Sequence, residues 1–174
     1  LNSEKLIFFM NIMVLDFEGS LKNGIREIGS VFANDSGILS HENLVVTNHK
    51  DCIGALYRVL NNKPNLFVSH NVHVEKNLLK KYLPYDRNKK VKSSLEWGPW
   101  LDTKEMYNIL YPDLIQYDLK YLTENFIKKE VQTVSSIICL PNKSKPHFAL
   151  YDAICAYLLF KRIKNKINIS KFIQ

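Results

Sequence analysis

Residues 11–20 read Asn-Ile-Met-Val-Leu-Asp-Phe-Glu-Gly-Ser, and in this stretch an apolar run ends in two carboxylates. Residues 12–17 form a short segment with two β-branched side chains, and the Gly-Ser pair after it favours a strand over a helix. Successive side chains alternate faces on a strand, so Asp16 and Glu18 are expected on one face, about 7 Å apart. Two neighbouring carboxylates repel each other unless a cation lies with them, which predicts a site for Mg²⁺ or Mn²⁺. The alternative is a solvated strand end, in which both residues only confer solubility.

The chain has 174 residues, of which 46% are hydrophobic and 11% aromatic. This length suits one domain, residues 1–174, that buries roughly 70% of the surface of its unfolded chain. No apolar run approaches the length of a membrane span, about 18 residues, and residues 6–10 are too short for the apolar part of a secretory signal. We therefore expect a cytoplasmic protein without membrane association. Cysteines are few and far apart, which predicts buried free thiols at Cys52, Cys139 and Cys155.

Lys and Arg number 24 against 17 Asp and Glu, a formal net charge of +7 at pH 7. Such a balance favours polyanionic partners through long-range attraction and counterion release, and nucleic acid is the natural candidate. The alternative is that lysine enrichment follows genome composition and that the protein binds nothing anionic.

Periodicity and turn residues predict an α/β domain. After residues 12–17, further strands are expected at residues 24–32, 38–47, 66–68 and 100–103, the first of them in a hairpin with the opening strand. The expected helices are one capped by Asp51, one from Val74 to Leu83, one after Asp102, one over residues 119–126 and one over residues 146–164. Residues 131–140 suit an extended arm or a helix, and residues 85–94 an exposed basic loop. This order of elements predicts a mixed sheet with a hairpin-rich edge followed by crossover units.

Polar residues stand at the ends of four of these elements: Asp16 with Glu18, His70-Asn71 with Glu75 one helical turn later, Asp102, and His147 with Asp152. In this order they resemble the DEDD 3′–5′ exonucleases, particularly the His-containing DEDDh branch. That DnaQ-like branch includes the proofreading epsilon subunit of bacterial replicases, RNase T and oligoribonuclease. The motifs that carry the likeness are residues 14–20 with 25–31, 67–79, 100–103, 111–122 and 146–153, so the resemblance covers about residues 12–162.

The resemblance implies a ribonuclease H-like fold, a mixed five-stranded sheet flanked by helices. It also implies two Mg²⁺ or Mn²⁺ ions that straddle the scissile phosphate, one activating the attacking water and the other stabilising the leaving oxygen. Asp16 would bridge both ions, and Glu18 and Asp152 would hold the ion that binds the water. His147 would act as general base, since an imidazole can take up a proton near neutral pH. The alternative for His147 is a histidine that caps a helix or lies at the edge of the core.

The chain departs from the family pattern at three positions. Glu75 stands where the second motif ends in Asp, and it would serve as the fourth acidic ligand with an arm one methylene longer. Val74 stands where many relatives carry an aromatic residue, and Gly19 where many carry Thr; in the family both positions lie near the terminal nucleotide. The candidates for substrate binding are Gly19, Ser20, His70 and Asn71. His73 suits a surface position, and Asp102 suits a helix cap better than a metal ligand.

The function implied is a metal-dependent hydrolase that removes nucleoside 5′-monophosphates from the 3′ end of DNA or RNA. Such an enzyme works alone in DNA repair or RNA trimming, or as a proofreading subunit with a polymerase partner; the substrate is single-stranded or 3′-ended nucleic acid. The alternative function is a catalytically weak nucleic-acid-binding or polymerase-accessory module that keeps the fold.

Overall fold

The computed structural model describes residues 10–83 and 97–174. The described chain forms a five-stranded sheet in the order β3-β2-β1-β4-β5. The strands are β1 (Ile12–Ser20), β2 (Gly24–Asn34), β3 (Gly37–Val45), β4 (Leu66–Ser69) and β5 (Trp100–Asp102). β1 pairs antiparallel with β2 and parallel with β4, so the sheet is mixed, as the sequence predicts. The hairpin-rich edge is β1-β2-β3, and β4 and β5 are added by crossovers.

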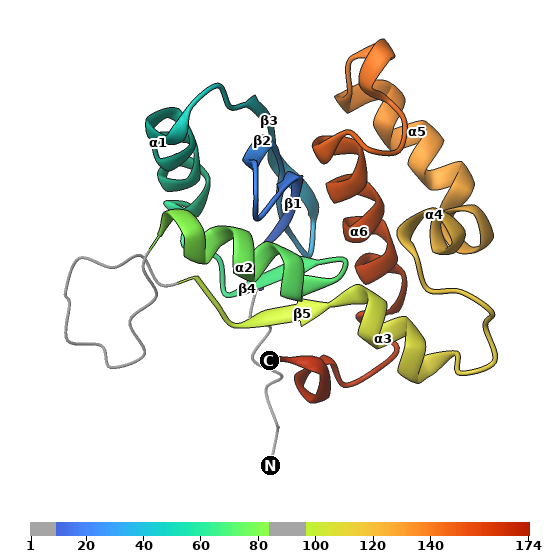
Figure 1. Ribbon diagram of the computed structural model, residues 1–174. Helices are drawn as coiled ribbons and strands as arrows, with labels where there is room; N and C mark the ends of the chain where they lie inside the picture. The colour runs from blue at the N-terminus through green and yellow to red at the C-terminus, as the bar shows by residue number, and fades with distance from the viewer. Residues whose placement is uncertain (1–9, 84–96) are drawn as a thin grey trace.

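Helices cover both faces of the sheet (Figure 1). α1 (His49–Leu60) and α2 (Val72–Tyr82) lie on one side, with the apolar residues Met13, Leu15 and Phe17 of β1 beneath them. α6 (Ala149–Ile163) lies on the other side over Ile12 and Val14, and α3 (Thr103–Leu110), α4 (Leu119–Leu122) and α5 (Lys128–Ile138) surround it. The alternation of side chains along β1 therefore divides the core into two layers. Asp16 and Glu18 continue the row of Ile12 and Val14 toward α6.

The long hairpin contains a bulge at the point where the carboxylates lie. The pairing register of β1 with β2 shifts between Glu18 and Gly19, and β1 continues to Ser20, beyond the predicted end at residue 17. A Cβ atom at Gly19 would lie 2.3 Å from the carbonyl oxygen of Gly24, so the two backbones are too close for any side chain. This close approach is a physical reason for glycine at the position where the resembled family carries Thr.

Several helix boundaries differ from the predicted ones. The N-cap of α1 is Asn48, whose side chain accepts a hydrogen bond from the backbone N–H of Asp51; the predicted cap Asp51 is therefore wrong. α6 begins at Ala149 instead of Pro146, because His147 has a left-handed backbone with φ 67° that no α-helix accommodates. Helix α4 passes at Leu122 into a π-helical turn (Thr123–Ile127). Residues 131–140 are largely helical in α5, and the predicted basic loop 85–94 lies outside the described residues.

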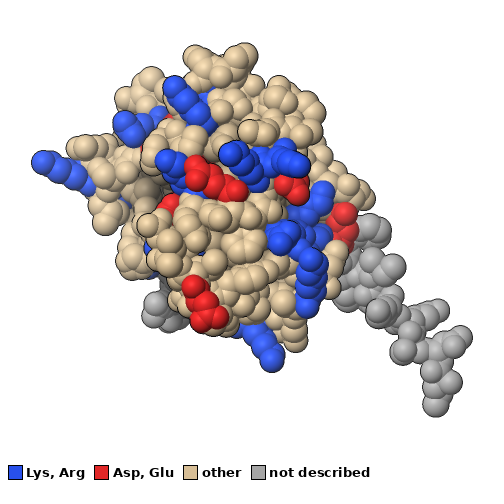
Figure 2. All heavy atoms as spheres, turned by 90° about the vertical axis from the view of Figure 1, so that its right-hand side faces the viewer, with Lys and Arg blue, Asp and Glu red and all other residues tan. Residues whose placement is uncertain are grey.

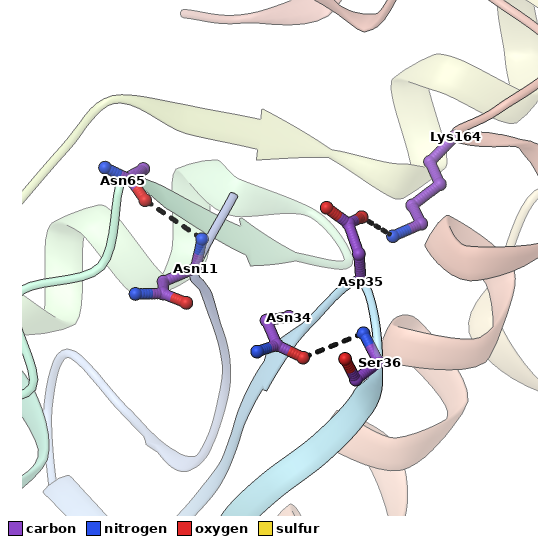
Figure 3. Close-up of polar contacts among 6 residues, drawn as sticks. All are labelled: Asn11, Asn34, Asp35, Ser36, Asn65 and Lys164. Atoms are coloured by element: carbon purple, nitrogen blue, oxygen red, sulfur yellow. Dashed lines mark hydrogen bonds and ion pairs between the residues drawn. The ribbon is translucent and has the colours of Figure 1, made fainter. Parts of the chain in front are cut away.

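The end of the sheet where β1 begins is closed by short polar contacts (Figure 3). Lys164, at the C-cap of α6, forms an ion pair with Asp35 in the β2–β3 turn, with 2.6 Å between Nζ and Oδ1. The Asn65 side chain accepts a hydrogen bond from the N–H of Asn11, next to the starts of β4 and β1. The free thiols Cys52, Cys139 and Cys155 are buried, as predicted. Among the described residues, no helix has the length and apolar character needed to cross a bilayer.

Candidate active site

The opposite end of the sheet carries the acidic residues. Asp16 lies at the centre of the sheet on β1, directly opposite Gly29 of β2 and on the face toward α6. Glu18 follows two residues later on the same face, opposite Glu27 of β2. Both acidic side chains are partly buried. Asp16 and Glu18 therefore share one face of β1, as predicted. The surrounding helices determine which other side chains lie near these two carboxylates.

The first turn of α6 brings Asp152 to these carboxylates. Ligand atoms of Glu18, His147 and Asp152 all lie within 4.8 Å of one another. His147 sits in the loop just before α6, and its backbone N–H donates a 3.0 Å hydrogen bond to Oδ2 of Asp152. This bond ties the exposed histidine to the carboxylate five residues later. Two oxygens and one imidazole nitrogen at this spacing form a donor set that suits a divalent cation.

Glu75 reaches the site from the first turn of α2, on the other side of the sheet. Glu75 is only 4% exposed, and the backbone of Phe17 on β1 lies close enough to its carboxylate to influence its pKa. Its second oxygen, Oε2, is buried without a hydrogen-bond partner in the described part of the chain. A buried carboxylate oxygen without a partner carries a large desolvation cost, which a bound cation would offset. The longer side chain of Glu75 therefore places an oxygen beside the β1 carboxylates.

Several carboxylates lie near one another in the site, and burial shields them from water. Burial raises the pKa of Asp16 well above its ordinary value, and the charges of Asp152, Glu75 and Glu18 raise it further. Burial also raises the pKa of Asp152 to about 7 and that of Glu75 to about 8. Without a cation, these groups hold protons at pH values where isolated carboxyl groups are ionised. Glu18, His147 and Asp152 are thus spaced as a cluster that could hold a cation, whereas Asp16 and Glu75 lie outside that cluster and are linked to it by the effect of the neighbouring charges on the pKa of Asp16.

Asp102 makes a different set of contacts. Its carboxylate accepts hydrogen bonds from the N–H groups of Lys104 and Glu105, so it caps α3 as expected. It also accepts from the N–H groups of Asn71 and Val72 at 3.0 and 2.9 Å, which fixes the start of α2. Because α2 carries Glu75 in its first turn, Asp102 helps to place that carboxylate without belonging to the acidic group itself.

The four candidate substrate-binding residues lie on different parts of the rim. Gly19 and Ser20 end β1, and the Ser20 hydroxyl accepts a hydrogen bond from the N–H of Asn23 in the hairpin turn. Asn71 starts α2 with a left-handed backbone, φ 72°, and its side chain makes no capping bond. Nε2 of His70 donates to the carbonyl of Tyr117, and its Nδ1 lies 2.9 Å from the Thr103 hydroxyl. Burial lowers the pKa of His70 to about 4, so this ring is neutral at pH 7.

Two residues of β2, Gly29 and Glu27, also shape the site, and the sequence analysis did not identify them as site residues. A Cβ atom at Gly29 would lie 2.0 Å from the carbonyl carbon of Ala149, so only glycine lets the start of α6 approach β2 opposite Asp16. Glu27 lies beside Glu18 but forms an ion pair with Lys143, 2.7 Å between Oε1 and Nζ. Burial alone would raise the pKa of Glu27, but hydrogen bonds from Lys143 and Asn43 lower it below its ordinary value. Glu18 also has a cation nearby, the exposed Arg26, with 3.5 Å between the guanidinium and Oε2, but the ion pair of Glu27 with Lys143 is shorter and less exposed.

The comparisons with known proteins agree with the architecture. A scan against models of protein families finds no match, and neither does a search of curated proteins. A search of solved structures matches exonuclease X in complex with 5′ overhanging duplex DNA. The match has a TM-score of 0.55 and 19% sequence identity, and it covers 92% of this chain and 96% of that chain. At this identity the match establishes the fold, so the chain has the mixed, helix-flanked sheet of the ribonuclease H-like class.

Proposed function

We propose that this protein is a single-domain 3′–5′ exonuclease of the DEDDh branch. In this proposal it hydrolyses phosphodiester bonds at the 3′ end of DNA or RNA and releases nucleoside 5′-monophosphates. The observation that carries the proposal is the convergence of Asp16, Glu18, Glu75 and Asp152 from β1, α2 and α6, with raised pKa values at three of them. A divalent cation would stabilise mutually repelling carboxylates in a partly buried site, and the fold is shared with an exonuclease.

The residues present would hold two Mg²⁺ or Mn²⁺ ions. Asp16 would contact both ions, Glu18 and Asp152 would hold one of them, and Oε2 of Glu75, which has no hydrogen-bond partner in the described part of the chain, would complete the set. When bound, such ions polarise a phosphoryl oxygen and lower the pKa of bound water. The protein's own contribution is to fix the carboxylates on rigid elements before substrate arrives.

His147 is the proposed general base. It is exposed at the rim, so a water molecule and a substrate phosphate can reach its ring, and its backbone is tied to Asp152. A histidine that takes a proton in the transition state contributes about 10² to 10⁴ in rate. Its position in a loop, outside the helix, lets the imidazole lean over the acidic group.

The substrate class follows from charge. The chain carries a net charge of +7, and Lys and Arg side chains outnumber Asp and Glu on the face seen in Figure 2. A net positive charge favours a polyanionic strand, and we propose that its end lies at the carboxylates. Exonuclease X, whose fold is shared, is seen in complex with DNA that has a 5′ overhang. We propose a 3′ end of single-stranded or overhanging nucleic acid as substrate, a cytoplasmic location and a role in repair or proofreading.

The experiment that tests this proposal compares the wild-type protein with Asp16→Asn on labelled single-stranded DNA and RNA, with Mn²⁺ and with EDTA. A label at the 5′ end should yield a ladder that shortens from the 3′ end, and a label at the 3′ nucleotide should appear as the monophosphate. Asp16→Asn should abolish hydrolysis and leave folding intact, because it removes the central charge with little change in shape. Wild-type-like turnover by the variant, or turnover in EDTA, would contradict the metal assignment.

A second candidate function is a nucleic-acid-binding or polymerase-accessory module with weak catalysis. The observation that favours it is Glu75, which stands at the position of an Asp in the resembled family. In this case the same assay shows binding of the labelled strands without their shortening.

A further inference from the structure

His147 lies in the loop that precedes α6, and a residue of β2 contacts this loop. Lys143 lies at the start of this loop, and its Nζ forms an ion pair of 2.7 Å with Oε1 of Glu27. The side chains of Lys143 and Glu27 are only 22% and 11% exposed. The backbone of Ala149, the first residue of α6, also lies close enough to the Glu27 carboxylate to lower its pKa. One side chain of the sheet therefore holds the start of the segment 143–149 and lies near its end.

The middle of the same segment has a strained conformation. His147 has φ 67°, in the left-handed region that residues with a side chain rarely adopt. Such a conformation persists when its surroundings determine it, and here three contacts do so. The backbone N–H of His147 donates to Asp152, and the ammonium groups of Lys143 and Lys145 each lie 5.6 Å from the centre of the Phe148 ring. If the ends of the loop were released, the chain could return to an unstrained conformation with the imidazole elsewhere.

We propose that Glu27 and Lys143 are positioning residues, whose ion pair holds the loop so that the His147 imidazole stays beside Glu18 and Asp152. The inference rests on the proposed function and adds to it two residues that do not touch the reacting atoms. Glu27 lies directly opposite Glu18 on the hairpin, so the anchor of the loop and the acidic group share one rigid element. An imidazole displaced by about 1 Å costs as much as a hundredfold in rate, so a loose loop lowers turnover without unfolding the protein.

The chain offers a matched control at the other end of α6. Lys164 forms an ion pair of 2.6 Å with Asp35, and its side chain is 12% exposed, but this pair lies at the start of β1, away from the acidic group (Figure 3). Lys143→Met and Lys164→Met each remove one cation and keep an aliphatic side chain. Lys143→Arg keeps the cation, and Glu27→Gln removes the negative charge with little change in shape.

The experiment measures kcat and KM on a 3′-ended oligonucleotide, the thermal midpoint and amide hydrogen exchange of all five proteins. Lys143→Met and Glu27→Gln should lower kcat about 10- to 100-fold with KM changed less than about threefold. Lys143→Arg should recover most of the rate, and Lys164→Met should keep wild-type kcat. The amide of His147 should exchange about tenfold faster or more in Lys143→Met, while amides in the second half of α6 keep their rates.

The outcomes separate the two proposals. Wild-type kcat and exchange in Lys143→Met would overturn the positioning role and leave the exonuclease intact. Equal losses in Lys143→Met and Lys164→Met would also overturn it, because a general loss of stability would explain both. If the wild-type protein does not hydrolyse nucleic acid, the proposed function fails, and the exchange of the His147 amide alone decides whether the ion pair holds the loop.

Discussion

At the scale of single residues, the carboxyl group of Glu75 is the most consequential in the site. It is almost completely buried, one of its oxygens has no partner among the described residues, and burial raises its pKa from 4.5 to about 8. The folded protein therefore binds a proton at Glu75 more tightly than the unfolded chain does. Without metal, folding stability is highest when this group is protonated, and it falls as pH rises from about 4.5 through 8.

Glu75→Gln should flatten this pH dependence, because the amide carries no proton to lose. In EDTA, the free energy of unfolding of the wild-type protein should fall between pH 5 and pH 9, and the variant should lessen that fall by on the order of 3 kcal/mol. Urea unfolding at several pH values measures the difference. Glu130→Gln, at an exposed position on α5, is the control and should leave the wild-type curve unchanged. Parallel curves for Glu75→Gln and the wild-type protein would exclude a buried, proton-binding Glu75.

At the scale of elements, the contact between α6 and β2 determines the site. Ala149, Ala153 and Ala156 of α6 are fully or almost fully buried, and these small residues let the helix pack closely on the sheet. The closest approach is at Gly29, directly opposite Asp16, where an added Cβ would overlap the backbone of Ala149. Because Asp152 is in the first turn of α6, any shift of this helix moves Asp152 away from Asp16.

Gly29→Ala should therefore reduce both stability and turnover. Overpacking against backbone should cost about 1–3 kcal/mol in the free energy of unfolding, and the displaced Asp152 should lower kcat about tenfold or more. Gly54→Ala is the matched control, since Gly54 lies in α1 with nothing within 4 Å of an added Cβ. That variant should raise stability by about 0.5–1 kcal/mol and keep wild-type kcat. Chemical denaturation and steady-state kinetics measure both effects. Equal stability and equal kcat in the two variants would contradict the role of the Gly29 contact in placing α6.

At the scale of the whole molecule, the net charge of the chain is positive, whereas the candidate active site is acidic. The chain as a whole is basic, with a net charge of +7, and Lys and Arg side chains are spread over the face seen in Figure 2, which is the right-hand side of Figure 1, where α4 and α5 lie. The carboxylates instead gather where β1, α2 and α6 meet. A polyanionic strand is therefore attracted by the surface, and its phosphate can approach the acidic centre only with cations present.

Binding of single-stranded DNA by Asp16→Asn with Mg²⁺ should consequently weaken about tenfold or more between 50 and 200 mM salt, given about three phosphate contacts. Fluorescence anisotropy with a labelled oligonucleotide measures this. An oligonucleotide of the same bases with an uncharged backbone is the control and should show little salt dependence. Equal salt dependence of both ligands would argue against recognition through phosphates.

Much of the fold was predictable because it depends on local patterns. The alternation of apolar residues along β1, the turn residues of the hairpins and the Asp102 cap are read from neighbours in the chain, and the five strands were placed within a few residues. The cap of α1 was misassigned because Asn48 and Asp51 are both good capping residues, and only the backbone of Asn48 is extended. The start of α6 was placed too early because proline suits a first helical turn, whereas the left-handed His147 excludes it.

The sequence by itself determined the acidic end of the first strand, the positive net charge and the α/β order of elements, since each of these depends on residue type and short-range spacing. Tertiary structure decided which groups meet. Glu27 and Lys143 are 116 positions apart, and nothing in either neighbourhood predicts their ion pair. Likewise, the close contact of Gly29 with Ala149 and the partner-free oxygen of Glu75 arise only when α6 and α2 pack against opposite faces of β1 and its neighbours. Long-range contacts depend on how whole faces pack, and the physical cost of burying each group is known only once its neighbours are in place.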